Sequence, residues 1–235
     1  VELLNGYLTA VTEVILKRRG VVDKYIGDAV MAFWGAPLEE KNHAYLACVS
    51  ALEMSAAAET FSGAQGEGTP PIKTGYGINT GDVIVGNMGS HQRFDYTAIG
   101  DAVNLASRLE GLNKEYGTEI IASSMTIEAI QKSGKLGEFA YRFLDRVIVK
   151  GKNEPVPIYE ILNFKENFSG SEWLAVYEKG VEAFEKQDAV VSRQCFERVI
   201  EIKGDDGPSR FFLKRLEDIE KGDASWEAAT KMTHK

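Results

Sequence analysis

The sequence predicts an α+β fold followed by an all-helical segment, and two observations carry this prediction. Up to about residue 162, short runs rich in β-branched and aromatic residues alternate with stretches whose apolar residues recur every three to four positions. Such strand–strand–helix blocks are typical of a mainly antiparallel sheet with helices on one face. From about Asn163 onward, only the helical spacing remains.

The N-terminal part of the chain predicts two helices. The first covers residues 1–19 and is ended by Gly20. Its apolar stripe is expected to consist of Leu4, Leu8, Val11 and Ile15. The second helix is predicted over about residues 42–61, and the Gly- and Pro-containing stretch 62–71 is expected to be a loop.

Residues 20–35, between these helices, read as two short apolar strands joined by a tight Gly27-Asp28 turn. Lys24 and Asp28 are the unusual residues, because the ribbon around them is otherwise apolar. A carboxylate at a hairpin tip suits Mg²⁺, which keeps most of its waters and takes one or two protein carboxylates. Taken alone, Asp28 is better explained as a turn carboxylate that stabilises the hairpin.

The following segment predicts a second hairpin and a long helix. The hairpin consists of strands over 72–79 and 83–87 around a turn at 80–82. The helix has Asp101 as its N-cap and ends near Gly117. The other predicted elements are an extended segment over 89–99, a strand over 119–122, a helix over 124–132, and strands over 139–150 and 157–162.

The C-terminal segment has the spacing of one tetratricopeptide-type helix pair plus a further helix. The residues with this spacing are Trp173, Tyr177, Gly180, Phe184, Phe196 and Val199, then Phe211, Leu213 and Leu216. One such repeat cannot bury its own apolar face. The segment therefore packs on the preceding domain, pairs with a partner, or begins a longer array, and a helical cap on the domain is favoured.

The composition limits the possible function classes. A net charge of −8 over 235 residues argues against a nucleic-acid-binding surface, but not against a nucleotide substrate. Cys48 and Cys195 form no disulfide framework, which favours a reducing compartment. The chain contains no signal peptide and no apolar run approaching 18 residues. We therefore expect a cytoplasmic protein, and the opening inside a helix suggests a fragment with a sensor or membrane segment upstream.

Two motifs, KYIGDAVMAFWG and DYTAIGDAVNLASRLE, closely resemble those of the class III nucleotidyl cyclases, which make cyclic AMP or cyclic GMP. The stretches INTGDVIVGNMGS and VKGKNEPVPIYEIL are similar to the family as well. The resemblance covers residues 1–162. It implies a ferredoxin-like palm domain that lacks its first strand here, with residues 163–235 as a tetratricopeptide-like helical extension.

The resemblance implies that Asp28 binds metal, in a site that holds two Mg²⁺ or Mn²⁺ ions in the intact family. These ions would clamp the attacking and leaving oxygens while the ribose 3′-oxygen displaces pyrophosphate from the α-phosphorus. The family's other metal-binding aspartate lies on the strand that is missing here. Low activity of this chain is therefore expected.

The resemblance also implies roles for residues that bind the nucleotide. Lys24 would donate to adenine N1 and Thr97 would read the exocyclic amine, which points to ATP; taken alone, Lys24 reads as a surface lysine of a strand. Asn104 would orient the ribose and Arg108 would stabilise the charge on the α-phosphate. These two residues are four apart, so they share one helix face. Lys150 would bind the triphosphate, with Lys152 as a competitor for that role.

In the family the metal ligands of one protomer meet the base- and phosphate-binding residues of the other across a head-to-tail dimer. A homodimer with a shared active site is therefore expected. The predicted function is an adenylate cyclase that converts ATP to 3′,5′-cyclic AMP and pyrophosphate. The alternative is a non-catalytic cyclase-homology module for dimerisation or nucleotide sensing. A ferredoxin-like RNA binder is a weaker alternative, because the chain is acidic and lacks paired strand aromatics.

Overall fold

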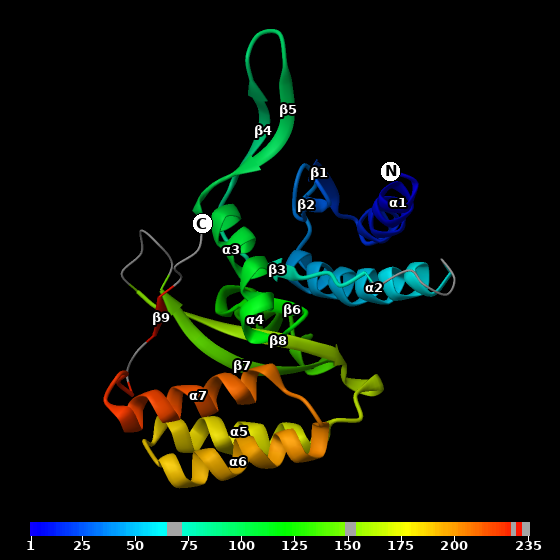
Figure 1. Ribbon diagram of the computed structural model, residues 1–235. Helices are drawn as coiled ribbons and strands as arrows, with labels where there is room; N and C mark the ends of the chain where they lie inside the picture. Colours follow the sequence, from blue (N-terminus) through cyan, green and yellow to red (C-terminus); the bar gives the residue numbers. More distant parts are fainter. Residues whose placement is uncertain (65–71, 149–153, 227–228, 232–235) are drawn as a thin grey trace.

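The computed structural model describes residues 1–64, 72–148, 154–226 and 229–231, and it confirms the α+β class (Figure 1). Its helices are α1 (Glu2–Lys17), α2 (His43–Ala64), α3 (Asp101–Tyr116), α4 (Ser124–Lys132), α5 (Ser171–Glu185), α6 (Ala189–Lys203) and α7 (Gly207–Lys221), with 3₁₀ turns at Leu136–Glu138 and Lys165–Asn167. Its strands are β1 (Val21–Ile26), β2 (Ala29–Phe33), β3 (Tyr76–Ile78), β4 (Ile84–Gly89), β5 (Phe94–Ile99), β6 (Ile120–Ser123), β7 (Phe139–Ile148), β8 (Val156–Phe164) and β9 (Thr230–Lys231).

The central sheet has five strands in the order β3-β6-β8-β7-β9, and two separate hairpins, β1–β2 and β4–β5, accompany it. Strand β8 runs antiparallel to both of its neighbours, whereas the outer strands β3 and β9 are parallel to theirs. Strand β8 also continues to Phe164, across the predicted domain boundary at residue 162. The division into 1–162 and 163–235 stays a prediction.

The predicted second hairpin, between strands over 72–79 and 83–87, is wrong, because these two strands do not pair with each other. Strand β3 pairs in parallel with β6, with Tyr76 opposite Ile120, and β4 pairs instead with β5, with Ile84 opposite Ile99. The segment expected to be merely extended is therefore a strand, and the true hairpin turn lies near Ser90. Two neighbouring strands in a sequence favour a hairpin locally, but their partners are decided by contacts that sequence spacing does not encode.

Figure 1 shows α3 and α4 on one side of the central sheet and the C-terminal helices α5–α7 on the other. Leu144 of β7 packs in one apolar cluster with α3, while Phe143, beside a register shift in β7, packs in another cluster with α5–α7. The helical segment thus packs on the sheet domain, as the favoured alternative predicted.

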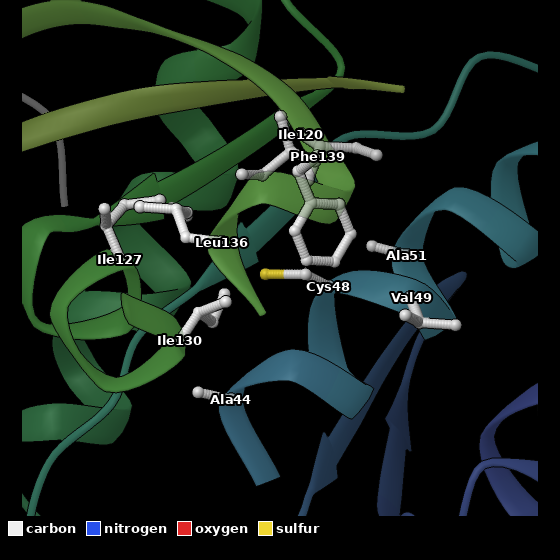
Figure 2. Packing of buried hydrophobic residues seen from close by; sticks show 11 residues of the cluster. Ala44, Cys48, Val49, Ala51, Ile120, Ile127, Ile130, Leu136 and Phe139 are labelled. Carbon is white, nitrogen blue, oxygen red and sulfur yellow. The ribbon is translucent and has the colours of Figure 1, made fainter. Parts of the chain in front are cut away.

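A second region of the core lies between α2, α4 and the sheet (Figure 2). Cys48 and Ala51 of α2 lie beside Phe139 of β7 and Ile130 of α4, and none of these four side chains is more than 3% exposed. Burial raises the pKa of the Cys48 thiol to about 12. This cysteine is therefore a small apolar core residue rather than a reactive one.

The N-terminal ends of two helices differ from expectation. In α1 the buried stripe consists of Tyr7, Val11 and Ile15, which pack on Met54 and Ala58 of α2. Leu4, expected in that stripe, is 38% exposed. In α3, Asp101 is the first helical residue instead of the N-cap, and the N-cap is Gly100. The carboxylate still lies in the first turn, where the helix dipole favours a negative charge.

A buried ion-pair network joins the sheet to the C-terminal helices. Arg142 of β7 is 1% exposed and donates to Glu160 of β8 at 2.6 Å. Its two terminal nitrogens donate to the carboxylate of Asp206, at the start of α7, at 2.9 and 2.8 Å. The guanidinium also lies 5.0 Å from the Trp173 ring centroid and 4.6 Å from that of Tyr177. The buried guanidinium is therefore paired with one carboxylate of the sheet, Glu160, and one of the C-terminal helical segment, Asp206.

Candidate functional site

The β1–β2 hairpin contains a bulge at the residue before Lys24. Val22 pairs with Ala32 and Lys24 pairs with Met31, so Asp23 is the extra residue of the bulge and has no paired residue on β2. A bulge of this kind turns a side chain away from the regular alternation of a strand. Asp23 and Lys24 consequently contact each other, with 3.2 Å between Lys24 Nζ and Asp23 Oδ1.

Asp23 connects the first hairpin to β5. Its Oδ2 accepts the hydroxyl proton of Thr97 at 2.6 Å and the backbone N–H of Ala98 at 3.0 Å. The Asp23 side chain is completely buried, while 39% of the Lys24 side chain remains exposed. The structure therefore brings Lys24 and Thr97 to the same carboxylate, although 73 positions separate them in the sequence. Sequence reasoning gave Asp23 no role; an aspartate inside an otherwise apolar strand was the available signal.

Asp28 lies at the exposed tip of the same hairpin, beside Gly27, whose φ of 65° is in the left-handed region that glycine tolerates. Its charge acts on α3 of the same chain: burial, and secondly the nearby Asp28, raise the pKa of Glu110. The Asp28 carboxylate therefore lies near enough to Glu110 of α3 for their charges to interact. This proximity was not predicted from the sequence.

Helix α3 carries the two predicted polar residues next to its buried face. The buried face is the predicted one and consists of Leu105, Leu109, Leu112 and Tyr116, at 1%, 0%, 3% and 1% exposure. Asn104 is exposed and Arg108 is half-buried on the adjoining face. Strand β3 holds the helix closely, because a Cβ at Gly77 would lie only 2.2 Å from backbone atoms of Ala106 and Glu110.

The described residues support one metal-binding carboxylate, Asp28, but not the expected two-metal centre. Among residues 1–64, 72–148, 154–226 and 229–231, no group of three or more His, Cys, Asp or Glu side chains is placed to hold a metal ion. The single exposed carboxylate of Asp28 fits one contact to a largely hydrated Mg²⁺. It does not fit a two-metal centre, which needs further bridging carboxylates. Lys150 and its competitor Lys152 lie outside the described residues.

The β4–β5 hairpin projects away from the rest of the chain (Figure 1). Apolar side chains on it are widely exposed, at 70% for Ile84, 64% for Phe94, 38% for Tyr96 and 50% for Ile99. Exposed apolar groups gathered on one projecting element are typical of an interaction surface. Separately, none of the described helices has the length and apolar character that a membrane span requires.

The site has three parts: a hairpin with Lys24 and the acidic tip Asp28, a strand whose Thr97 contacts the same aspartate as Lys24, and a helix with Asn104 and Arg108. Together these parts define a cyclase-type domain. The family model of the adenylate and guanylate cyclase catalytic domain matches residues 1–163, and the chain belongs to this family. Domains of this family act on nucleotide substrates and generally use divalent metal ions.

Individual relatives agree with this assignment. Adenylate cyclase 1 of Rhizobium meliloti is 38% identical over 163 residues, which is 69% of this chain and 24% of that protein. The terminal-differentiation-specific adenylate cyclase of Dictyostelium discoideum is 35% identical over 218 residues, which is 92% of this chain and 10% of that protein. The second match therefore extends into the C-terminal helices. The chain spans less than a third of the length of either relative.

Two solved structures share the fold. The adenylyl cyclase CyaB from P. aeruginosa superposes with a TM-score of 0.61 at 35% identity, covering 72% of this chain and 84% of that one. The guanylyl cyclase Cya2 superposes with a TM-score of 0.60 at 32% identity, covering 72% and 82%. The palm-type fold predicted from the sequence is thereby confirmed. Because the two neighbours carry different activities, overall similarity leaves the choice of nucleotide to the site residues.

Proposed function

We propose that this chain is the catalytic domain of an adenylate cyclase, which converts ATP to 3′,5′-cyclic AMP and pyrophosphate. The observation that carries the proposal is the meeting of Lys24 and Thr97 at Asp23. The Lys24 ammonium is a donor only, and it complements N1 of adenine, which accepts. Guanine has an N–H at that position, so two donors would oppose each other. The relatives named adenylate cyclase support the same substrate.

The residues of α3 supply the remaining chemistry in this proposal. The ribose 3′-oxygen attacks the α-phosphorus in line with the departing pyrophosphate. Arg108 stabilises the negative charge that grows on the α-phosphate oxygens, for which the planar guanidinium fork is well suited. Asn104, one turn earlier on the helix, orients the ribose. Thr97 on β5 and Lys150 contact the base and the triphosphate.

Asp28 would hold a divalent metal ion, Mg²⁺ or Mn²⁺, which neutralises phosphate charge when bound. The described residues fit a single carboxylate contact and not a two-metal centre. No step is therefore assigned to a pair of metal ions.

We further propose that the working form is a homodimer that shares its active sites between protomers. The exposed apolar residues of the β4–β5 hairpin support this, because a second copy would cover them. Sedimentation of the wild type and of an Ile84→Glu, Phe94→Glu variant tests the arrangement. A dimer that persists in the variant would place the interface elsewhere.

The catalytic proposal is tested by incubating the purified protein with ATP or GTP and Mg²⁺ or Mn²⁺ and measuring both cyclic nucleotides. We expect cyclic AMP from ATP, and we expect Arg108→Ala to lower kcat about 10²- to 10³-fold with little change in KM. Arg198→Ala is the matched control, since Arg198 is an exposed residue of α6. Cyclic GMP as the main product would reverse the substrate assignment.

A non-catalytic module for dimerisation or nucleotide sensing is the second candidate. The specific observation in its favour is the lack, among the described residues, of a carboxylate cluster for metal. Nucleotide binding without any cyclic product, with either metal ion, would favour this candidate over the enzyme.

A further inference from the structure

The carboxylate of Asp23 contacts both side chains that the proposed function assigns to the base. Its Oδ2 accepts the Thr97 hydroxyl at 2.6 Å and the Ala98 N–H at 3.0 Å. Its Oδ1 has Lys24 Nζ 3.2 Å away as counter-charge and, within the described part of the chain, accepts no hydrogen bond. The Asp23 side chain is wholly buried. It therefore lies behind Lys24 and Thr97 and acts on a ligand only through them.

We propose that Asp23 is a positioning residue that sets the purine selectivity of this site, an inference that rests on the proposed function. A threonine hydroxyl has one proton and two lone pairs, so an unconstrained hydroxyl either donates or accepts. An ionised carboxylate only accepts. Because the single Thr97 proton points to Asp23, Thr97 can offer a ligand only its lone pairs.

This fixed polarity distinguishes the two purines. Adenine carries an amino group at C6, which donates, whereas guanine carries a carbonyl oxygen there, which accepts. An acceptor fixed at Thr97 therefore matches adenine and opposes guanine. The rejection is strong when a buried polar group would be left facing a group of the same kind.

Asp23 also positions Lys24, the second residue that the proposed function assigns to the base. Its charge keeps the Lys24 ammonium 3.2 Å from Oδ1, while Thr97 donates to Oδ2 of the same carboxylate. The ammonium is held as a counter-charge and donates no hydrogen bond to Oδ1, so its N–H donors remain for a ligand. The β1 bulge makes this possible, because it lets two consecutive residues act on the same site.

Two substitutions of Asp23 separate these effects. Asp23→Ala removes the acceptor, so the Thr97 hydroxyl becomes free to rotate and to donate to guanine O6. Asp23→Asn keeps an amide oxygen for Thr97 and Ala98, removes the charge opposite Lys24 and places an NH2 group where Oδ1 was. We expect Asp23→Ala to lower the preference for ATP over GTP by about tenfold or more, the scale of one hydrogen bond, and Asp23→Asn to lower it less.

The measurement is the dissociation constant of ATP and of GTP, obtained by competition with a fluorescent ATP analogue. Binding is read out instead of turnover, so the test does not depend on catalysis. Arg198→Ala, at an exposed residue of α6 away from the site, is the control and should retain the wild-type preference. If the wild type prefers ATP and Asp23→Ala keeps the same preference, the proposed role of Asp23 is refuted and the proposed substrate is not affected. A wild type without preference for ATP would overturn the proposed substrate, and this inference with it.

A second measurement needs no variant and covers the case in which Asp23→Ala fails to fold. The dissociation constants of the wild type for two ATP analogues are compared. Purine riboside triphosphate has no polar group at C6, and inosine triphosphate has an acceptor there. Inosine also carries an N–H at N1, so the fixed polarity of Thr97 and the donor Lys24 both predict that inosine triphosphate binds more weakly than purine riboside triphosphate. Equal or tighter binding of inosine triphosphate would show that the hydroxyl still donates.

Discussion

Replacing Asp206 by Asn should strongly destabilise the attachment of the C-terminal helices to the sheet. Asp206 accepts two hydrogen bonds from Arg142, one from Lys203 at 2.7 Å, and two from the N–H and hydroxyl of Ser209 at 3.0 and 2.6 Å. In the variant, the buried Arg142 keeps only Glu160 as a charged partner among the described residues. Removing one partner of a buried ion pair costs about 3–5 kcal/mol. That is a large part of a typical stability of about 5–15 kcal/mol.

The pH dependence gives an independent measure of the same contact. Burial by itself would raise the pKa of Asp206, but hydrogen bonds and charge from Arg142, with Lys203 and Ser209, lower it from 3.8 to about 2. A carboxylate with a lowered pKa stabilises the fold above its unfolded-state pKa and loses that contribution as the pH falls towards the folded-state value. Between pH 4 and pH 2, a shift of this size corresponds to roughly 2 kcal/mol.

The assay is urea unfolding of the wild type and of Asp206→Asn at several pH values from 7 down to 3. The difference in unfolding free energy should be largest at neutral pH and should narrow below pH 4. Glu220→Gln, which breaks the exposed pair of Glu220 with Arg193, is the control and should cost less than about 1 kcal/mol. A difference below 1 kcal/mol for Asp206→Asn, or one that does not change with pH, would refute the reasoning.

Three further outcomes follow from α3 and its neighbours. Leu109→Ala removes a side chain with 0% exposure and should cost about 2–5 kcal/mol in thermal or urea unfolding; a loss under 1 kcal/mol would mean that the helix is not anchored there. Gly77→Ala introduces a Cβ 2.2 Å from backbone atoms of Ala106 and Glu110, so it should lower both the melting temperature and nucleotide turnover, and an unchanged protein would contradict the close packing. Asp28→Asn should lower the pKa of Glu110, followed by NMR titration, because one of its two causes is removed; an unchanged pKa would separate the hairpin tip from α3.

The sequence was most informative where the determining contacts are local. The β1–β2 hairpin was predicted because Gly27-Asp28 carries its own turn preference. The buried face of α3 was predicted because residues three and four apart share a face, as Leu105 and Leu109 do. The family motifs then indicated the fold as a whole, which the solved cyclase structures confirm.

The misses concern contacts between distant parts of the chain. Strand β3 takes β6 as its partner, over 40 positions away, and spacing gives no sign of that pairing. The role of Asp23 depends on the bulge and on β5, which lies 74 positions further along. The roles of Asn104, Arg108 and Lys150 remain predictions, because they depend on a ligand or lie outside the described residues.

The buried position of Arg142 has a consequence for how this chain can be dissected. A protein cut after residue 163, where the family match ends, would lose Asp206 and the rings of Trp173 and Tyr177. Its guanidinium and the aromatic side of β7, including Phe143, would then face water or another molecule. Such a fragment would be prone to aggregation, and its poor behaviour would say nothing about the chemistry of the intact domain.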